Sequence, residues 1–417
     1  MNVVGIITEH NPFHNGHLYH VNKARETCHA DYVVSVMSGH FLQRGEPALF
    51  NKWARAKMAV LGGVDLVIEL PTAFSVRSAR MFSIGSVSLL NLTGVVSHVC
   101  FGSESGTIEE LQPVANLLAN EPPEFKGILA DFLGEGMSFP SARAKAITRY
   151  FSESQQIEVN PDLYNAPNNI LGIEYLRSLI TLKSPIKPVT IKRYVAGYHD
   201  NEIATDRTIA SATSIREELL ASRGNLNDMI MKVIPPTTYE IMEHEIILGQ
   251  GPVFMENYRK ILFYLLRTLA PANLRSLCDV TEGLENRILH MSREAENVKA
   301  LINKIKTKRY TWTRIQRILT YILLGYTSAM ANSFDSTGPR YLRILGISAK
   351  GSGLLKAIKK RADVPVIIRT SSYLSKQDSI AEMLNFDVRA SDIYSLLYPG
   401  TSAHHGNDYK IMPYFQV

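Results

Sequence analysis

Short apolar runs alternate with helix-length segments through the first hundred residues of the chain. The runs are rich in Val and Ile and lie at 3–8, 32–37, 64–70 and 96–101, with the longer segments between them at 15–28, 51–62 and 76–92. Strands that are buried on both faces read as continuous apolar runs, and helical crossovers between them imply a parallel sheet. The pattern therefore predicts an α/β fold that begins with a Rossmann-like βαβαβαβ unit.

The rest of the chain is mostly helical in pattern. Helical segments fill 107–183, and an apolar strand candidate follows at 187–193, so we expect a helical insertion and then a return to the sheet. Proline and glycine punctuate the region that follows. We predict a Rossmann-like domain at 1–225, with its insertion at about 107–183. A mainly helical domain at 226–417 is expected to carry a small αβ element near 340–370.

Composition narrows the class of protein. The chain has 417 residues, of which 45% are hydrophobic and 20% charged, as in folded globular proteins of two or three domains. Three widely spaced cysteines exclude a disulfide framework and match no metal-site spacing, which favours a reducing compartment. The N-terminus lacks the features of a signal peptide, and the charge-free stretches at 81–103 and 318–334 are too polar or too short to span a bilayer. We expect a soluble, cytoplasmic protein.

The candidate chemistry follows the first predicted strand. Histidines stand at 10, 14, 17 and 20, and Asn11 or Asn15 can cap the helix that begins there. A helix N-terminus offers unpaired N–H groups and partial positive charge, both suited to phosphate. His14 and His17 are three residues apart and share one face of the first turn, and Gly16 leaves room for a nucleotide beside the backbone. Polar surface histidines or a zinc site are the alternative readings, although the spacing lacks an i, i+4 pair.

The segment Thr8 to His17 (TEHNPFHNGH) resembles the signature of the HIGH-type nucleotidyltransferase superfamily. Four longer segments, at 36–47, 62–71, 101–104 and 168–175, make the chain similar to the family of bacterial tRNA(Met) cytidine acetate ligases. The resemblance extends over essentially the whole chain, and its most specific segments lie in the first 220 residues.

The resemblance implies an ATP-dependent reaction in two steps. Acetate attacks the α-phosphate of ATP to give acetyladenylate, and the acetyl group then passes to N4 of the wobble cytidine of elongator tRNA(Met), forming N4-acetylcytidine. Acetate is already a nucleophile at neutral pH, so the first step needs positioning and charge stabilisation. We further expect Mg²⁺ to accompany ATP, no metal bound by the protein itself, and no obligate protein partner.

The same resemblance assigns site residues. His14 and His17 would be the catalytic pair. The ATP site would comprise Ile7, Thr8, Glu9, His10, Asn11, Pro12, Phe13, His14, Asn15, Gly16, His17, Leu18, Tyr19, His20, Gly102, Asn169, Lys192, Arg193, Thr213, Ser214 and Arg216. Without the family, Gly102 is equally a turn glycine and Asn169 a helix cap. Arg44, Lys52 and Arg55 are further candidates for phosphate contacts.

A basic segment lies between residues 297 and 362. It holds fourteen Lys or Arg residues against one acid, Asp335, so its local net charge is +13 in a chain whose total is +6. Such segregation is typical of proteins that bind a polyanion. The tRNA-binding candidates are Lys304, Lys306, Lys308, Arg309, Arg314, Arg317, Lys359, Lys360 and Arg361. Tyr310, Trp312 and Tyr321 could stack on unpaired bases; the alternative is a solvated helix face with aromatic residues in the core.

Two other functions fit parts of the pattern. A small-molecule adenylyltransferase of the HIGH-type superfamily would carry the same histidines and act on a mononucleotide-like substrate, but it would not need the basic C-terminal region. A non-catalytic RNA-binding protein would not need both histidines. The acceptor of the activated group distinguishes these alternatives.

Overall fold

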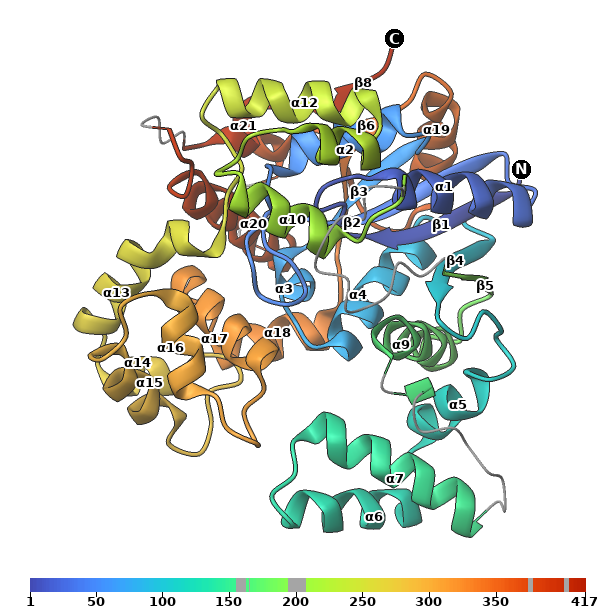
Figure 1. The fold of residues 1–417 in the computed structure, drawn as a ribbon. Coiled ribbons are helices and arrows are strands. Elements are labelled where there is room, and N and C mark those ends of the chain that lie inside the picture. Colours follow the sequence, from blue (N-terminus) through green and yellow to red (C-terminus); the bar gives the residue numbers. More distant parts are fainter. Residues whose placement is uncertain (155–162, 165, 194–207, 374–377, 401–404) are drawn as a thin grey trace.

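The computed structural model describes residues 1–154, 163–164, 166–193, 208–373, 378–400 and 405–417 (Figure 1). Its centre is a sheet with the strand order β5-β4-β1-β2-β3-β6-β7, with β8 pairing beside β6. The strands are β1 (Val3–Thr8), β2 (Tyr32–Ser38), β3 (Leu66–Leu70), β4 (His98–Ser103), β5 (Lys187–Lys192), β6 (Leu342–Ile347), β7 (Val366–Ile367) and β8 (Tyr414–Phe415). The pairs among β1 to β5 are all parallel, which confirms the predicted Rossmann-like sheet.

Helices cover both faces of this sheet because alternate strand residues enter two separate cores. Val4 and Ile6 of β1 pack against one core, and Val3 packs against the other. The helices of the first hundred residues are α1 (Asn15–Thr27), α2 (Lys52–Leu61), α3 (Thr72–Ser75) and α4 (Ala79–Leu92). Helices α1 and α2 pack in the core that contains Val4 and Ile6, and α4 packs in the core that contains Val3. The Leu90 side chain of α4 fills the space beside Gly5, so a side chain at residue 5 would clash with it.

The predicted insertion is helical where it is described. Its helices are α5 (Gln112–Asn120), α6 (Pro123–Gly134), α7 (Phe139–Ser154) and α9 (Pro167–Thr181). Helix α9 packs along α4 and β4, whereas α6 and α7 pair with each other at the end of the molecule farthest from α12 in Figure 1. The insertion thus extends the fold on the β4–β5 side of the sheet.

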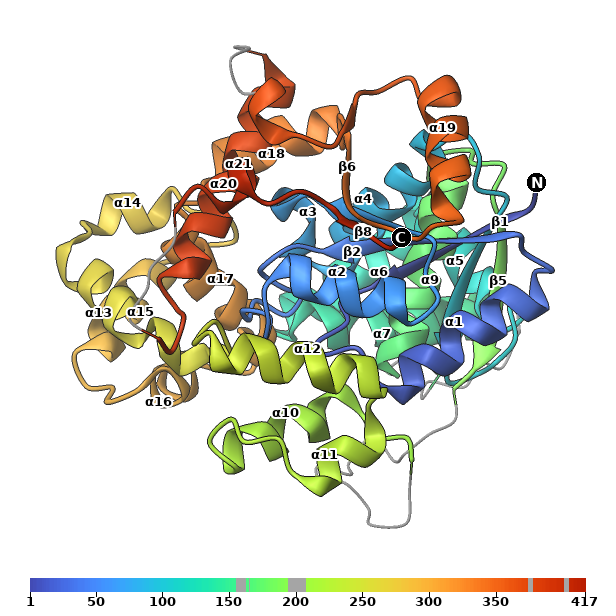
Figure 2. The same ribbon diagram turned by 90° about the horizontal axis from the view of Figure 1, so that it is seen from above.

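After β5 the chain builds two helical groups. The first is α10 (Ala212–Ala221), α11 (Asp228–Val233) and α12 (Pro236–Ile247), which joins the core containing α1 and α2. The second, which we call the helical unit, comprises η1 (Met255–Tyr258), α13 (Arg259–Thr268), α14 (Pro271–Arg275), α15 (Leu284–Ser292), α16 (Val298–Ile305), α17 (Trp312–Leu324) and α18 (Ser328–Thr337). Helices α13 to α16 lie to one side of the sheet in both views (Figures 1 and 2). No helix of the described residues is long and apolar enough to cross a membrane.

The C-terminal segment returns to the sheet. It comprises β6, α19 (Gly351–Arg361), β7, η2 (Thr370–Ser372), α20 (Ser379–Ser395), α21 (Asn407–Lys410) and β8. The αβ element expected near 340–370 is present, but its strand β6 pairs antiparallel with β3, so Leu66 lies opposite Ile347. Residues after 340 therefore share a sheet with residues before 104. The division of the chain near residue 225 remains a prediction.

A buried cluster of four charges fastens this C-terminal segment to the sheet. The Nζ of Lys52 lies 2.8 Å from Glu69 Oε1 and 2.8 Å from Asp408 Oδ1. Arg343 Nε lies 3.3 Å from Glu69, and its guanidinium also contacts Asp408. Burial opposes ionisation of Asp408, but Lys52 and Arg343 outweigh it and hold the pKa of that carboxyl below its ordinary value. Lys52 is fully buried and engaged here, so its expected role as a phosphate contact is wrong.

We predict that Lys52→Met lowers the free energy of unfolding by about 3–5 kcal/mol, because it leaves two buried carboxylates with one cation between them. Urea unfolding measures this. Lys57→Met is the matched control, since Lys57 lies exposed on the same helix and should cost less than about 1 kcal/mol. A Lys52→Met protein as stable as the parent but defective in phosphate binding would restore the original expectation.

Candidate active site

An imidazole caps the N-terminus of α1 at the carboxyl edge of the sheet. His14 Nδ1 accepts a hydrogen bond from the Gly16 N–H at 3.0 Å, and His17 Nδ1 accepts one from the His14 N–H at 3.4 Å. This reciprocal pair has the geometry of a capping box, with histidines in both roles. Because each Nδ1 acts as an acceptor, the ring proton of each neutral histidine lies on Nε2. Neither Nε2–H donates to another of the described residues, so both are available as donors.

The two rings pack together in a cluster with His10 and Phe13. The centroids of His14 and His17 lie 3.8 Å apart, and those of His10 and His17 lie 4.8 Å apart. Burial, helped by the charges of Arg193 and Arg216, lowers the pKa of His14 to about 3. Burial and the neighbouring histidines hold the pKa of His17 well below its ordinary value. Both rings are neutral donors at physiological pH.

Gly16 is required by the cap itself. A Cβ at this position would lie 2.8 Å from His14 Cε1. The sequence suggested that this glycine makes room for a nucleotide, whereas in the structure the space beside it is taken by the His14 ring. A side chain at residue 16 would push the ring out of its capping position.

The segment that contains α10 lies against the loop that joins β1 to α1, residues 9–14. Arg216 donates to the carbonyl of Asn11 at 3.3 Å and to Thr213 Oγ1 at 3.2 Å. Asn15 Nδ2 donates to the carbonyls of Thr208 and Lys232 at 2.8 and 3.2 Å. Ser214 is buried, and its N–H is capped by Ser211 Oγ at 3.0 Å. The structure thus brings Thr213, Ser214 and Arg216 beside the histidines, and a second helix N-terminus with them.

The ends of β4 and β5 supply two more expected residues on the other flank. The Arg193 N–H donates to the Ser103 carbonyl at 2.9 Å, directly beyond the paired strands. A Cβ at Gly102 would lie 2.9 Å from Arg193 Cγ, so this glycine lets the arginine cross the sheet edge. Lys192 and Arg193 are exposed, and the charge of Arg193 is felt at both His14 and His17.

Asn169 lies near this flank but uses its side chain within the protein. It is 1% exposed; its Oδ1 accepts from the N–H groups of Glu104 and Ser105, and its Nδ2 donates to the Leu163 carbonyl. Its contact to a nucleotide stays a prediction, and its visible role is to anchor the loop after β4. Sequence reasoning missed Asn168, which bonds Glu104 Oε1 at 2.6 Å and accepts from Arg193. Its adjacency to Asn169 was the available signal.

The other residues expected at the ATP site form the loop and the first turn of α1. Thr8 Oγ1 lies 2.8 Å from Ser35 Oγ, and Asn11 Oδ1 accepts from the Leu49 N–H at 2.7 Å. Burial and the charge of Arg193 lower the pKa of His20 to about 4. Pro12 and Phe13 are buried, Ile7, Glu9 and Leu18 are half-buried, and Tyr19 is exposed.

Two arginines named as phosphate candidates differ in position. Arg55 is fully buried and donates to the carbonyls of Phe50, Glu9 and Ser38 at 2.9, 2.6 and 3.2 Å. These bonds hold the loop after β2 against the end of β1, so Arg55 acts as a scaffold rather than a phosphate ligand. Arg44 lies exposed on that loop.

The candidate tRNA-binding cations fall into two groups. Lys304, Lys306, Lys308 and Arg309 are exposed near α16 and α17, although Lys304 and Arg309 pair with Glu294 and Glu282. Arg314 donates to the Asp279 carbonyl at 3.0 Å, and Arg317 is half-buried. Lys359, Lys360 and Arg361 end α19, which lies far from α16 in both views (Figures 1 and 2). The basic segment is therefore not one continuous surface.

The aromatic residues among these cations are mostly internal. Tyr321 is fully buried and donates to the Val76 carbonyl at 2.6 Å, so the expectation that it stacks on a base is wrong. Tyr310 is buried as well, and Trp312 is half-buried with its Nε1 bonded to Gln316.

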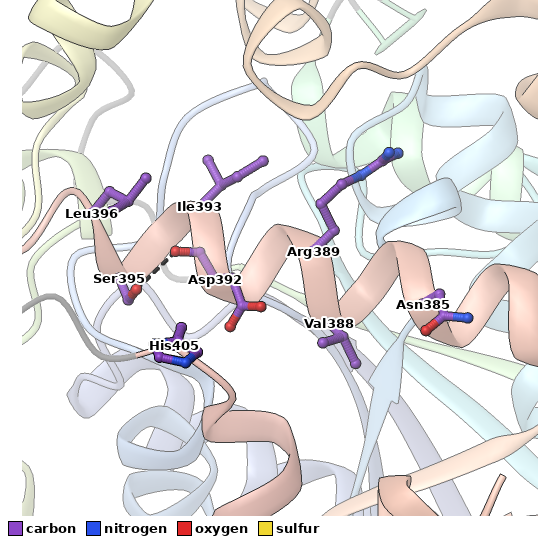
Figure 3. Close-up of a pocket in the computed structure, with 8 residues that line it drawn as sticks. All are labelled: Asn385, Val388, Arg389, Asp392, Ile393, Ser395, Leu396 and His405. Atoms are coloured by element: carbon purple, nitrogen blue, oxygen red, sulfur yellow. Dashed lines mark hydrogen bonds between the residues drawn. The ribbon is translucent and has the colours of Figure 1, made fainter. Parts of the chain in front are cut away.

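A cleft of about 450 Å³ lies along α20, away from the residues expected to bind ATP. Figure 3 shows Arg389 and Ile393 on one side of the helix and Val388 and Asp392 on the other, so its polar groups do not converge on one point. Ser395 donates to the Asp392 carbonyl at 2.7 Å. Within the described part of the chain, no group of three His, Cys, Asp or Glu side chains is arranged to hold a metal ion.

Comparisons with known proteins agree on one family. A sequence model of the family HIGH Nucleotidyl Transferase matches residues 1–409. The chain is 43% identical over 403 residues to "tRNA(Met) cytidine acetate ligase" of Acetivibrio thermocellus, with 95% of each chain covered. It is 43% identical over 425 residues to the protein of the same name from Alkaliphilus metalliredigens, covering 100% of this chain and 99% of the relative.

Solved structures agree in fold over the whole chain. Thermotoga maritima TmcAL without ligand matches with a TM-score of 0.94 at 37% identity, and the same protein bound with α-thio ATP matches with a TM-score of 0.92; both comparisons cover 100% of each chain. The parallel sheet, the capped histidine pair and these full-length matches lead to one conclusion: this chain belongs to the HIGH nucleotidyl transferase family and, within it, to the tRNA(Met) cytidine acetate ligases.

Proposed function

We propose that this chain activates acetate with ATP and transfers the acetyl group to the wobble cytidine of elongator tRNA(Met). The observation that carries the proposal is the pair of neutral Nε2–H donors of His14 and His17 at the N-terminus of α1. It is supported by full-length relatives that are named tRNA(Met) cytidine acetate ligase and by one such fold bound with α-thio ATP.

The polyphosphate of ATP would lie over the N-terminus of α1. Its N–H groups and the two Nε2–H donors face the α-phosphate, and Arg193 and Arg216 flank it from β5 and α10. Donors that are fixed before the reaction stabilise charge as it develops, without reorganising. Thr213 and Ser214 add a second helix start, suited to the β- and γ-phosphates. Ile7 to His20, Gly102, Asn169 and Lys192 complete the proposed ATP site.

The first step joins an acetate oxygen to the α-phosphorus and breaks the bond to the bridging oxygen of pyrophosphate. Acetate is ionised at neutral pH, so no base is needed, and the protein contributes position and charge. Two neutral histidines suit this task because they donate hydrogen bonds but carry no positive charge. A positive charge there would bind the product pyrophosphate more tightly and slow its release. Mg²⁺ would arrive on the phosphates of ATP, since the described residues form no metal-holding group of their own.

The second step transfers acetyl from acetyladenylate to N4 of cytidine and gives N4-acetylcytidine. The exposed cations near α16 and α17 are the proposed tRNA-binding surface, with Lys359, Lys360 and Arg361 as a second, separate contact. In this proposal residues 1–225 carry adenylation and residues 226–417 carry most tRNA contacts. The three free cysteines support a reducing, cytoplasmic setting, and no obligate protein partner is proposed.

The proposal is tested by incubating the protein with ATP, labelled acetate and total bacterial tRNA. We expect label in elongator methionine tRNA alone, at one cytidine, because an activated acyl group is needed to modify a weakly nucleophilic amine. Mapping the label by nuclease digestion identifies the nucleotide. Label spread over many tRNAs would contradict the proposal. So would ATP–pyrophosphate exchange that depends on a mononucleotide instead of acetate, which would indicate a small-molecule adenylyltransferase.

A second prediction concerns the tRNA surface. Changing Lys299, Lys306 and Lys308 to Gln should weaken tRNA binding and reduce the salt slope of the binding constant by up to about 3, because three phosphate contacts are lost. These lysines are exposed, so the fold is spared. Filter binding across a salt series measures the effect.

Changing Lys359, Lys360 and Arg361 to Gln removes the same charge from the end of α19, a distant part of the structure. Comparing the two triple variants tells whether tRNA reaches both groups. If the first variant loses acetyladenylate formation to the same extent as it loses tRNA binding, its lysines support the fold rather than bind the RNA.

A further inference from the structure

The loop between β1 and α1, residues 9–14, has a neighbouring strand on each side of β1. We call this loop the histidine loop. Gly102, Lys192 and Arg193 come from β4 and β5, which lie on one side of β1 in the strand order. On the other side of β1 lies β2, and the loop that follows it, residues 41–47, borders the histidine loop there. Of the expected ATP-binding residues, Arg216 also reaches this flank, since its guanidinium lies 3.6 Å from Glu46. A second substrate that approached along this loop would therefore meet the proposed position of the phosphates.

The 41–47 loop also borders the helical unit. The Gly45 carbonyl accepts a hydrogen bond from Thr320 Oγ1 of α17 at 2.8 Å. A Cβ at Gly45 would lie 2.4 Å from the backbone nitrogen of Arg317, and this glycine has a φ of +82°, so only glycine fits the approach. The loop thus lies between the histidines and the helix that follows the exposed cations. An RNA base delivered from that surface would reach the active site here.

Two carboxylates lie at this junction. Glu9 follows β1 directly and receives the Gln43 N–H on Oε1 at 2.7 Å, and its carboxylate Oε2 has no hydrogen bond among the described residues. Glu46, at the end of the loop, lies 3.6 Å from Arg216 and is 25% exposed. A carboxylate is the side chain that pairs with the N4 amine of cytidine, since it accepts what that amine donates.

We propose that Glu9 accepts the proton from the N4 amine of the acceptor cytidine, and that the cytidine enters on the β2 flank between Glu9 and Glu46. The inference rests on the proposed function. The amine nitrogen forms a bond to the acetyl carbonyl carbon, and the bond from that carbon to the AMP oxygen breaks. AMP leaves with the electron pair, and the N–H proton passes to the Glu9 carboxylate, which later releases it to water.

The surroundings of Glu9 suit a proton acceptor. Burial raises the pKa of this carboxyl, the Gln43 N–H lowers it, and the negative charge of Glu46 raises it again. Arg44 and Arg216 act in the opposite direction, and the net result is a pKa above the ordinary value. Arg55 and Tyr175 are the other ionisable neighbours. A carboxylate of raised pKa takes a proton more readily near neutral pH.

The test uses Glu9→Gln, which keeps the size of the side chain and an oxygen that can accept the Gln43 N–H. Two rates are measured on the full-length protein: acetate-dependent ATP–pyrophosphate exchange, and single-turnover transfer of labelled acetyl to elongator methionine tRNA. We expect transfer to fall at least ~10²-fold more than exchange, the scale of losing a general base. Glu9→Asp keeps a carboxylate and should recover part of the transfer rate.

Two outcomes would overturn the inference. One is an unchanged ratio of transfer to exchange in Glu9→Gln, whether both rates are kept or both fall equally. The other is no difference between Glu9→Gln and Glu9→Asp. The unaltered protein run beside them separates this from the proposed function. If it shows no acetate-dependent exchange, the proposed function fails; if it is fully active while Glu9→Gln transfers normally, only the role of Glu9 fails.

Discussion

The cap on helix α1 is the interaction on which the rest of the site depends. The first N–H groups of a helix have no partner within it, and here the Nδ1 of His14 accepts one of them. That bond fixes the ring, assigns its proton to Nε2, and requires glycine at position 16. His17 is fixed in the same way by the His14 N–H. The need to cap the N-terminus of one helix thus fixes two hydrogen-bond donors where a phosphate can bind.

The C-terminal segment fastens onto the sheet that carries this arrangement. Strand β6 pairs with β3, and the cluster of Lys52, Glu69, Arg343 and Asp408 joins α2, β3, β6 and α21 with little access to water. Breaking such a cluster is costly, because the remaining charges stay buried. The same region is tied to the residue that follows the 41–47 loop: Tyr394 of α20 donates to the Ala48 carbonyl at 2.7 Å. The end of the chain therefore helps to position the flank of the site on which the second substrate is proposed to bind.

Much of the fold could be predicted from the sequence because the relevant signals are local. The apolar run at 3–8 is β1 itself, and the histidine spacing points directly to the helix start that the structure has. The pairing of β6 with β3 carries no such signal, since it joins strands about 270 residues apart and depends on the whole C-terminal path. In the αβ element expected near 340–370, the strand β7 that follows the helix comprises only 366–367.

The contacts of the site residues were also hard to predict from the sequence, because they depend on segments far apart in the chain. Residue type identified Lys52 and Arg55 as cations but could not tell that one joins a buried charge cluster and the other binds carbonyl groups. The basic segment is continuous along the chain, yet the return of β6 to the sheet carries α19, with Lys359, Lys360 and Arg361 at its end, away from α16. Likewise, Glu9 was visible only as part of a motif. Its neighbours, Gln43 and Glu46, became apparent only when the 41–47 loop was seen beside β1.

In the proposed function, His14 and His17 act as neutral, preorganised donors in the adenylation step. This role is tested most directly by acetate-dependent ATP–pyrophosphate exchange in His17→Ala and His17→Gln, compared at saturating ATP. Glutamine keeps an uncharged N–H near the position of Nε2 and cannot ionise. We expect a loss of at least ~10²-fold for alanine, the scale of one preorganised donor, with substantial recovery for glutamine. Near-normal exchange in His17→Ala, or equal loss in both variants, would contradict it.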